Sequence, residues 1–268
     1  MSAPIGWVAG KNDSMIAIIE KLNLTANLKL CLDAGDINSY PGSGTKWLDT
    51  SGNGYDFDFG DGSTSSTYPT FNGSAGGLSA SEYFSFDGGD YFSYDSANET
   101  WMNELHNAGV SVSLVAVIEC ANVGYYFCTT SGTGAGNYGA RLISTAPSSM
   151  ITMTWSVQNQ LSASSLTLST NCFYEPTNSK MAITGFSNTE NSGTTCDILV
   201  KGVTQQPITS VLTQSSANTP EHCVIGCRPD LSAFSTTSRM ACLAIWKGSK
   251  LTKAELQAIS NALSRRFQ

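Results

Sequence analysis

The chain has 268 residues, of which only 13% are charged, and its formal net charge is −7. Its 14 lysine and arginine residues form no basic run, which argues against nucleic acid as a ligand. The length is sufficient to bury a full hydrophobic core, and the abundance of Gly, Ser, Thr and Asn favours strands and turns over a helical bundle.

Neither a secretory signal nor a membrane span is expected from the sequence. The first apolar run, 15–19, follows Lys11 and Asp13 and is too short for either role. We therefore expect the protein to be made and folded in a cytoplasm. In that compartment the eight cysteines are expected to be thiols rather than a disulfide framework.

Several cysteines lie in or beside apolar stretches, where a free cysteine behaves as a small hydrophobic residue. They are Cys31, Cys196, Cys223, Cys227 and Cys242. A zinc site at His222, Cys223 and Cys227 is not supported, because no second Cys pair or His pair supplies the remaining ligands. Core thiols are the favoured interpretation, and no cofactor or metal is predicted.

Residues 1–26 are predicted to form an N-terminal arm, and residues 27–268 a sandwich domain. Residues 12–14 supply N-cap side chains, and an apolar stripe follows at helical spacing. The stripe consists of Met15, Ile16, Ile18, Ile19 and Leu22. A helix of about three turns is marginal alone in water, so this stripe must pack on another surface. The protein's own sheet and a neighbouring subunit are equally compatible with the pattern.

The leucines of 28–32 alternate with other residues, which is typical of a half-buried strand. A long turn-rich segment follows over 34–54, rich in Gly, Asp, Asn and Ser. Trp47 and Leu48 in its middle give this segment an apolar anchor. We interpret Trp47 as a packing residue rather than a ligand-binding platform.

Aromatic residues lie on both sides of Asp87-Gly88-Gly89-Asp90. Gly88 and Gly89 are therefore predicted to occupy the two positive-φ positions of a tight type I′ hairpin. The carboxylates of Asp87 and Asp90 flank the turn and are of the kind that calcium prefers. The favoured alternative is that they accept hydrogen bonds from the backbone of the turn itself.

The rest of the chain is predicted to be mostly strand until its last helix. Residues 111–118 become apolar on both faces, as in a central strand, and residues 151–157 alternate strictly, as in a strand with one wet face. A capping box over 252–255 begins the final helix, and Arg265 and Arg266 lie at its C-terminal end, where the dipole favours positive charge. Its apolar stripe consists of Leu256, Ile259, Leu263 and Phe267. Many short strands separated by turns indicate a β-sandwich or jelly roll.

Four segments carry a resemblance to a known superfamily. They are the opening strand with its loop Trp47, Asp49, Ser51, Gly52, Asn53 and Gly54, the segment 83–94, the segment 197–203, and the closing segment 225–259. Together they resemble the laminin-G-like members of the concanavalin A-like lectin/glucanase superfamily, especially versions from bacteriophages and bacteria. The resemblance covers about residues 28–268. It implies an all-β, two-sheet antiparallel jelly-roll sandwich, here with a short N-terminal helical arm and a C-terminal helix.

Glucanases of this superfamily carry a Glu-x-Asp-x-x-Glu strand, and the chain lacks this pattern. Glu99 and Glu104 fall in a predicted loop or helical turn with a different spacing. His106 and His222 lie near no recognisable nucleophile motif. The protein is therefore predicted not to be an enzyme.

Carbohydrate binding is a second class of function. Tyr125, Tyr126, Tyr138 and Arg141 flank a glycine-rich segment and are candidates to stack on a sugar ring and hold its hydroxyls. The alternative is that Tyr125 and Phe127 are core positions of an alternating strand.

The resemblance implies a third, structural class, since phage chains of this kind are frequently virion proteins. The leading prediction is a virion-surface accessory protein, either a capsid decoration or a fibre or tail component, synthesised in the host cytoplasm. It would attach to other virion proteins through Trp7 and the apolar stripe of the arm, and would self-associate into a homo-oligomer. The alternative is a carbohydrate-binding receptor-recognition module that contacts a host glycan.

Overall fold

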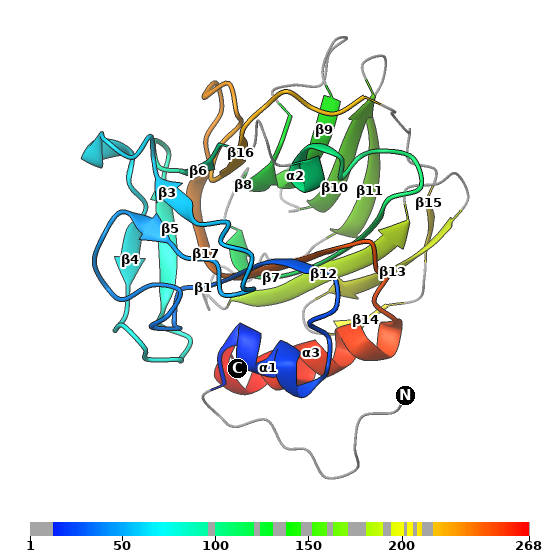
Figure 1. Ribbon diagram of the computed structural model, residues 1–268, viewed down its shortest axis with the longest axis horizontal. Coiled ribbons are helices and arrows are strands. Elements are labelled where there is room, and N and C mark those ends of the chain that lie inside the picture. Colours follow the sequence, from blue (N-terminus) through cyan, green and yellow to red (C-terminus); the bar gives the residue numbers. More distant parts are fainter. Residues whose placement is uncertain are drawn as a thin grey trace.

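The computed structural model describes residues 13–95, 100–120, 124–130, 138–145, 152–159, 163–170, 181–189, 194–200, 203–205, 208–210 and 217–267. Within these ranges the chain is mostly strand, arranged in two antiparallel sheets that face each other, with two helices beneath one of them (Figure 1). The predicted all-β sandwich with a C-terminal helix is confirmed.

The first sheet, sheet A, has nine strands among the described residues. In spatial order they are β14 (Val203–Thr204), β13 (Thr194–Val200), β12 (Ala182–Thr189), β7 (Ser111–Cys120), β17 (Thr236–Lys247), β5 (Tyr83–Asp87) and β4 (Thr70–Asn72), while β1 (Leu28–Asp33) pairs with β17 and β15 (Ile208–Ser210) pairs with β13.

The second sheet, sheet B, has eight strands in the same part of the chain. In spatial order they are β11 (Ala163–Thr170), β10 (Thr152–Asn159), β9 (Tyr138–Thr145), β8 (Gly124–Cys128), β16 (Cys223–Ile225), β6 (Phe92–Tyr94), β3 (Phe57–Phe59) and β2 (Lys46–Trp47). The helices are α1 (Met15–Lys21), α2 (Thr100–Asn103), α3 (Lys253–Phe267) and a 3₁₀ turn, η1 (Ser65–Thr67).

Strand β7 occupies the centre of sheet A, between β12 and β17, as its two-sided apolar pattern predicts. Leu114 and Ala116 face the core between the sheets, whereas Val115 and Val117 face the helices on the outer side. All four are 0% exposed, so both faces of this strand are covered.

Aromatic side chains fill the space between the two sheets. Trp47 is 0% exposed, and its ring centroid lies 4.9 Å from that of Phe84 and 5.0 Å from that of Phe92. Phe84 comes from sheet A and Phe92 from sheet B, so the tryptophan joins the layers. The interpretation of Trp47 as a packing residue is confirmed.

The loop 49–53 covers the free edge of β1. Asp49 Oδ1 accepts the N–H of Cys31 at 2.9 Å, and the N–H of Thr50 donates to the carbonyl of Cys31 at 2.9 Å. Asn53 Nδ2 donates to the carbonyl of Leu28 at 3.0 Å. Side chains and loop backbone therefore satisfy the groups that a neighbouring strand would otherwise bind.

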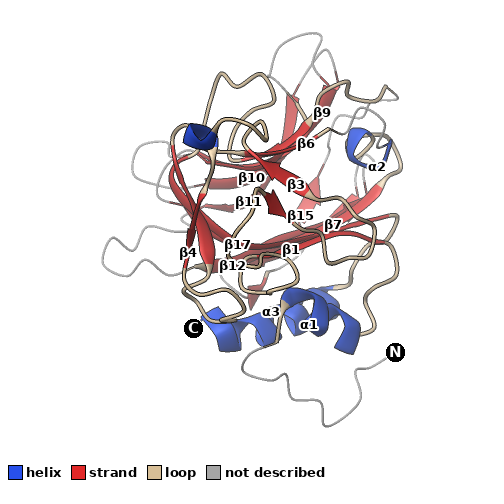
Figure 2. Cartoon of the chain, turned by 60° about the vertical axis from the view of Figure 1, so that its left-hand side comes forward, coloured by secondary structure: helices blue, strands red, loops and turns tan. Residues whose placement is uncertain are grey.

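Helices α1 and α3 lie side by side on the outer face of sheet A (Figures 1 and 2). Met15, Ile18 and Ile19 are at most 1% exposed and share one apolar cluster with the stripe of α3. Ile16 and Leu22 are partly buried against the same cluster.

The prediction that this stripe attaches to a partner is therefore corrected. The helix buries its apolar face within its own subunit, because α3 alone leaves part of the apolar outer face of sheet A to be covered. Trp7, the other predicted attachment residue, lies outside the described residues.

The capping box at the start of α3 is confirmed. Thr252 Oγ1 donates to Glu255 Oε2 at 2.8 Å, and the N–H of Glu255 donates to Thr252 Oγ1 at 3.3 Å. Leu251 and Leu256 are both buried beside it, as expected of a hydrophobic staple.

The predicted hairpin over 84–94 is wrong. Strand β5 pairs with β4 and β17 in sheet A, whereas β6 pairs with β3 and β16 in sheet B. Gly88 has a φ of +112°, but Gly89 does not adopt a positive φ. The segment 88–91 crosses between the sheets, and the aromatic residues on either side of it enter one shared core from opposite layers.

Candidate functional site

The predicted sugar-binding residues do not share one face of sheet B. Strand β8 has a bulge between Tyr125 and Phe127 in its pairing with β9. Because a bulge adds a residue to one strand, Tyr126 and Phe127 both enter the core and are 0% exposed. The Tyr126 hydroxyl lies 3.3 Å from Ser144 Oγ. Tyr126 is therefore corrected to a core residue, whereas Tyr125 lies on the outer face and is partly exposed.

Tyr138 lies apart from Tyr125, with its ring centroid 6.3 Å from that of His106. His106 is 0% exposed, and its Nε2 lies 2.9 Å from the carbonyl oxygen of Ala217. Since a carbonyl only accepts, Nε2 carries the hydrogen, and burial lowers the pKa of His106 to about 4. Tyr138, which is itself partly exposed, thus lies beside a neutral, buried histidine and is not part of the apolar cluster that contains Tyr125.

The loop 226–235 is fixed against Tyr125. The N–H of Gly226 donates to the carbonyl of Tyr125 at 2.7 Å, and the N–H of Tyr125 donates to Ser235 Oγ at 2.7 Å. Gly226 has a φ of +98°, and a Cβ there would lie 2.6 Å from the ring of Phe86. Only glycine fits this turn without strain. Gly226 therefore fixes the position at which the loop leaves β16 and begins to cross sheet B.

The loop completes a mixed aromatic and polar group that we call the outer patch. Its apolar members are Tyr91, Tyr125, Cys128, Val224, Cys227 and Phe234, and its arginines are Arg141 and Arg228. The rings of Tyr91 and Phe234 lie 6.2 Å apart between centroids. Sequence reasoning missed Arg228 and Phe234, although the Gly-Cys-Arg-Pro-Asp turn that contains Arg228 is visible in the chain.

Two arginines lie close to Tyr125 in the outer patch. Arg141 pairs with Cys128 across β8 and β9, and its Nε is buried without a hydrogen-bond partner. Arg228 Nη2 donates to Asp230 Oδ2 at 2.8 Å, and Arg228 Nε is also buried without a partner. Burial raises the pKa of Tyr125, and the two guanidinium groups act against that rise. Tyr125 therefore lies close to both arginines.

Asp87 and Asp90 form hydrogen bonds with the turn between them, as the favoured interpretation predicts. The N–H of Asp87 donates to Asp90 Oδ2 at 3.2 Å, and the N–H of Gly89 donates to Asp87 Oδ1 at 3.3 Å. Burial and the charge of Asp87 raise the pKa of Asp90 to about 6. Within the described ranges, no group of three or more His, Cys, Asp or Glu side chains is placed to hold a metal ion.

The cysteines that the structure describes are buried free thiols, which confirms the core-thiol interpretation for these positions. Burial raises the pKa of Cys31, Cys223 and Cys242 well above the ordinary value. Glu104 follows the helical turn α2 and pairs with Lys247, and Glu99 lies outside the described residues.

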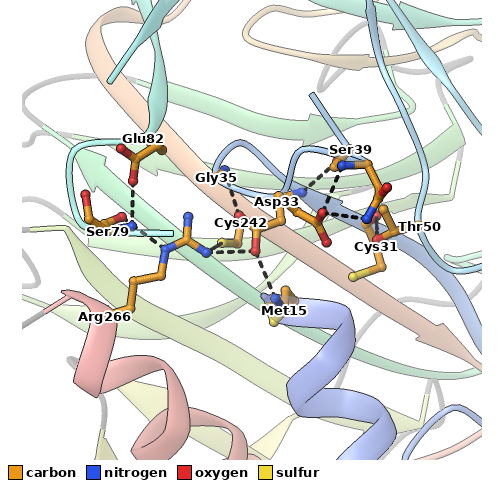
Figure 3. A network of polar contacts seen from close by, with 12 residues as sticks. Met15, Cys31, Asp33, Gly35, Ser39, Thr50, Ser79, Glu82, Cys242 and Arg266 are labelled. Carbon is orange, nitrogen blue, oxygen red and sulfur yellow. Dashed lines mark hydrogen bonds and ion pairs between the residues drawn. The ribbon is translucent and has the colours of Figure 1, made fainter. Parts of the chain in front are cut away.

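A second buried arginine, Arg266, joins both helices to sheet A (Figure 3). Its Nη1 donates to Asp33 Oδ2 at 2.7 Å, and its Nε donates to the carbonyl of Ser79 at 3.0 Å. The same Asp33 Oδ2 accepts the N–H of Met15 at 2.8 Å, at the start of α1. Asp33 Oδ1 accepts the N–H of Gly35 at 2.9 Å. One carboxylate thus connects β1, α1 and α3.

No helix among the described residues has both the length and the apolar character required to cross a bilayer. No protein-family model and no curated protein sequence matches the chain.

Solved structures share its fold at low sequence identity. A structure of botulinum neurotoxin type C, whose cell entry is described as dependent upon interaction with two ganglioside molecules, matches with a TM-score of 0.55 and 13% identity over 90% of this chain and 52% of that one. The ligand-binding domain of botulinum neurotoxin serotype D in complex with N-acetylneuraminic acid matches with a TM-score of 0.55 and 14% identity, over 88% of this chain and 51% of that one.

A Trypanosoma rangeli sialidase mutant displaying trans-sialidase activity matches with a TM-score of 0.54 and 14% identity, over 91% of this chain and 34% of that one. The chain spans about half the length of the two toxin structures. At these identities the matches show the fold alone, and that fold is a lectin-like β-sandwich.

Proposed function

We propose that this protein is a carbohydrate-binding receptor-recognition module that holds its sugar at the outer patch of sheet B. The observation that carries the proposal is the partly exposed ring of Tyr125 beside Arg141 and Arg228. An aromatic ring packs against the apolar face of a sugar, and guanidinium N–H groups donate to oxygen acceptors. The outer patch supplies both kinds of contact on one face of the sandwich.

The comparisons support this choice of ligand class. Two proteins with the same fold are described with sugar-containing ligands, one with gangliosides and one with N-acetylneuraminic acid. At 13–14% identity these matches carry no residue positions to this chain, so the position of the site is argued from the outer patch.

We infer binding rather than hydrolysis, although a sialidase shares the fold. Most glycoside hydrolases need two carboxyl groups on either side of the scissile bond, whereas sialidases use a tyrosine nucleophile. Burial raises the pKa of Tyr125, which disfavours its nucleophilic phenolate form. The charge of Asp230 also raises the pKa of Tyr125. Asp230 itself pairs with Arg228, and its Oδ1 accepts hydrogen bonds from Ser232. The charge of Asp61 contributes to the raised pKa of Tyr91, and Asp61 accepts hydrogen bonds from Ser63 and Thr64. Both carboxylates are therefore engaged within their own loops. Sugar release from fluorogenic glycosides, abolished by Asp230→Asn, would show that the inference is wrong.

The virion-surface role stays a prediction from the resemblance. With the apolar stripe of α1 buried in its own subunit, attachment to other virion proteins would use different residues.

A glycan array tests the proposed function. The wild-type protein is expected to bind a defined set of glycans, and Tyr125→Ala is expected to weaken that binding by about tenfold, the value of one aromatic contact. Tyr138→Ala is the matched control, since Tyr138 lies beside His106 and apart from the outer patch. Absence of binding to every glycan, or an equal loss in both variants, would contradict the proposal.

A further inference from the structure

Two arginine side chains are buried in the part of the chain that the structure describes, and only one of them has a carboxylate partner there. Arg266 is 6% exposed and pairs with Asp33, with a further hydrogen bond to Ser79. Arg141 is 8% exposed, and the described residues provide no ion pair to its guanidinium group. Its Nε, in addition, has no hydrogen-bond partner.

An unpaired buried guanidinium group is unfavourable. Removing a charge from water costs several kcal/mol unless an opposite charge or a full set of hydrogen bonds replaces the lost hydration. Arg266 has that replacement in Asp33. For Arg141 the replacement is absent from the described residues, and an anion from outside the chain would provide it.

The neighbours of Arg141 do not cancel its charge. Asp230 is paired with the other arginine of the patch, Arg228, whose own Nε is also buried without a partner. Burial raises the pKa of Tyr125, and it raises that of Cys128 to about 11, so both are neutral near pH 7. Around Tyr125 the two guanidinium groups face one carboxylate, that of Asp230. The other carboxylate near the patch, that of Asp61, acts on Tyr91 and accepts hydrogen bonds within its own loop.

The geometry of the guanidinium group defines which anion fits. A guanidinium group can donate two parallel N–H groups, which match two oxygens of a carboxylate or of a sulfate group. A lone hydroxyl would satisfy one donor and leave the charge uncompensated.

We propose that the sugar bound at the outer patch is acidic, with its carboxylate or sulfate paired to Arg141 and its ring against Tyr125. This inference rests on the proposed function and adds the chemical class of the ligand. It also distinguishes Arg141 from Arg266: Arg266 has a counter-charge within the fold, Asp33, although its Nη2 has no hydrogen-bond partner, whereas the counter-charge of Arg141 would come from the ligand.

Isothermal titration with matched sugars tests the proposal. The probes are lactose, lactose carrying terminal N-acetylneuraminic acid, lactose carrying a sulfate, and a disaccharide pair in which glucuronate replaces glucose. At least one acidic probe is expected to bind about tenfold or more tightly than its neutral counterpart, with an affinity that falls as salt is added. The acidic probe that binds identifies the anionic group.

Variants assign the effect to Arg141. Arg141→Met is expected to weaken binding of the acidic probe by about 10- to 100-fold and to leave neutral probes unchanged. Arg265→Gln is the matched control, because Arg265 is exposed on α3, which covers the other sheet. Equal affinities for acidic and neutral probes, or an unchanged affinity of Arg141→Met for the acidic probe, would overturn the inference and leave the proposed function intact. Absence of binding by every probe and every array glycan would overturn both.

Thermal unfolding of Arg141→Met separates a binding role from a structural one. Without ligand the variant is expected to unfold at the same temperature as the wild type or a higher one, because an uncompensated buried charge is removed. A large drop in the unfolding temperature would mean that the fold itself pairs Arg141, and the inference would be wrong.

Discussion

Asp33 and Arg266 are 233 residues apart in the sequence and form a buried ion pair between 1%- and 0%-exposed side chains. The pair is fully hydrogen-bonded on the carboxylate side, through the N–H groups of Met15 and Gly35. A buried pair of this kind adds little stability compared with apolar residues of equal volume, but removing one partner leaves the other charge uncompensated. The pair therefore fixes the position of α3 more than it strengthens the fold.

We expect Arg266→Met to lower the free energy of unfolding by about 3–5 kcal/mol, because Asp33 then stays buried without its counter-charge. Urea denaturation measures the loss. Arg265→Met, one residue away and exposed, is the control and should stay close to wild type. Equal losses in both variants would show that the helix surface, and not the ion pair, is responsible.

His106 gives the protein a specific pH dependence. The pKa of His106 is about 4 in the folded state against an ordinary value near 6.5, so the unfolded chain binds a proton that the folded chain does not. Its contribution to stability is complete above about pH 6.5 and is lost as pH falls toward 4, by an amount on the order of 3 kcal/mol.

The difference in stability between wild type and His106→Gln isolates this contribution. Glutamine retains an N–H donor for the carbonyl of Ala217 but does not titrate. Asp90, whose pKa is raised to about 6, acts in the opposite direction between about pH 4 and 6, but it is present in both proteins and cancels. From pH 7.5 to 4 the urea midpoint of the wild type should fall relative to that of His106→Gln, and parallel curves would contradict the assignment.

Single residues also show where sequence reasoning stops. The burial of Trp47 and of the described thiols follows from their apolar surroundings in the chain, and it was predicted. The ion pair of Arg266 with Asp33 was not predicted, because the helix dipole already accounts for an arginine at the C-terminal end of a helix. An aspartate such as Asp33 at the end of an apolar strand was the available signal, since a buried charge requires a partner.

At the scale of elements, the loop 49–53 acts in place of a strand at the edge of sheet A. It accepts and donates hydrogen bonds along β1, chiefly through Asp49, Thr50 and Asn53. This loop is one of the segments that carry the superfamily resemblance. Its function in this protein is structural, because it ends the sheet and blocks pairing with a second chain.

Asp49→Ala is expected to lower the free energy of unfolding by about 2–3 kcal/mol, because the buried N–H of Cys31 loses a charged acceptor. Thermal or urea unfolding provides the measurement. Asp61→Ala is the control: Asp61 also accepts hydrogen bonds, but only within its own exposed loop, and its loss should be smaller. A larger effect at Asp61 than at Asp49 would contradict this role for the loop.

Elements whose signals are local were predicted well, and elements that depend on distant pairing were not. The capping box of α3 and the central position of β7 follow from residues within one segment. The segment 84–94 has the composition of a hairpin, but its strands join different sheets, since either layer can bury the same aromatic side chains. The bulge in β8 leaves no mark in the sequence, and it separates Tyr126 from Tyr125.

At the scale of the whole molecule, the two outer faces of the sandwich are covered differently. The outer face of sheet A is closed by α1 and α3 (Figure 2). The outer face of sheet B carries the outer patch, where loop 226–235 and strands β8 and β9 bring Tyr125, Arg141 and Arg228 together. The alternating pattern predicted the sandwich, and Tyr125 and Arg141 were among the predicted sugar-binding residues. The loop that completes their surroundings was outside sequence reasoning, because it folds back from a distant part of the chain.

The position of a bound sugar in a crystal structure of the complex tests this account most directly. With an acidic oligosaccharide selected by titration, we expect the sugar ring to lie against Tyr125 and the anionic group to lie within hydrogen-bond distance of Arg141. A sugar bound beside Tyr138 and His106, or on the helix-covered side of the sandwich, would contradict it.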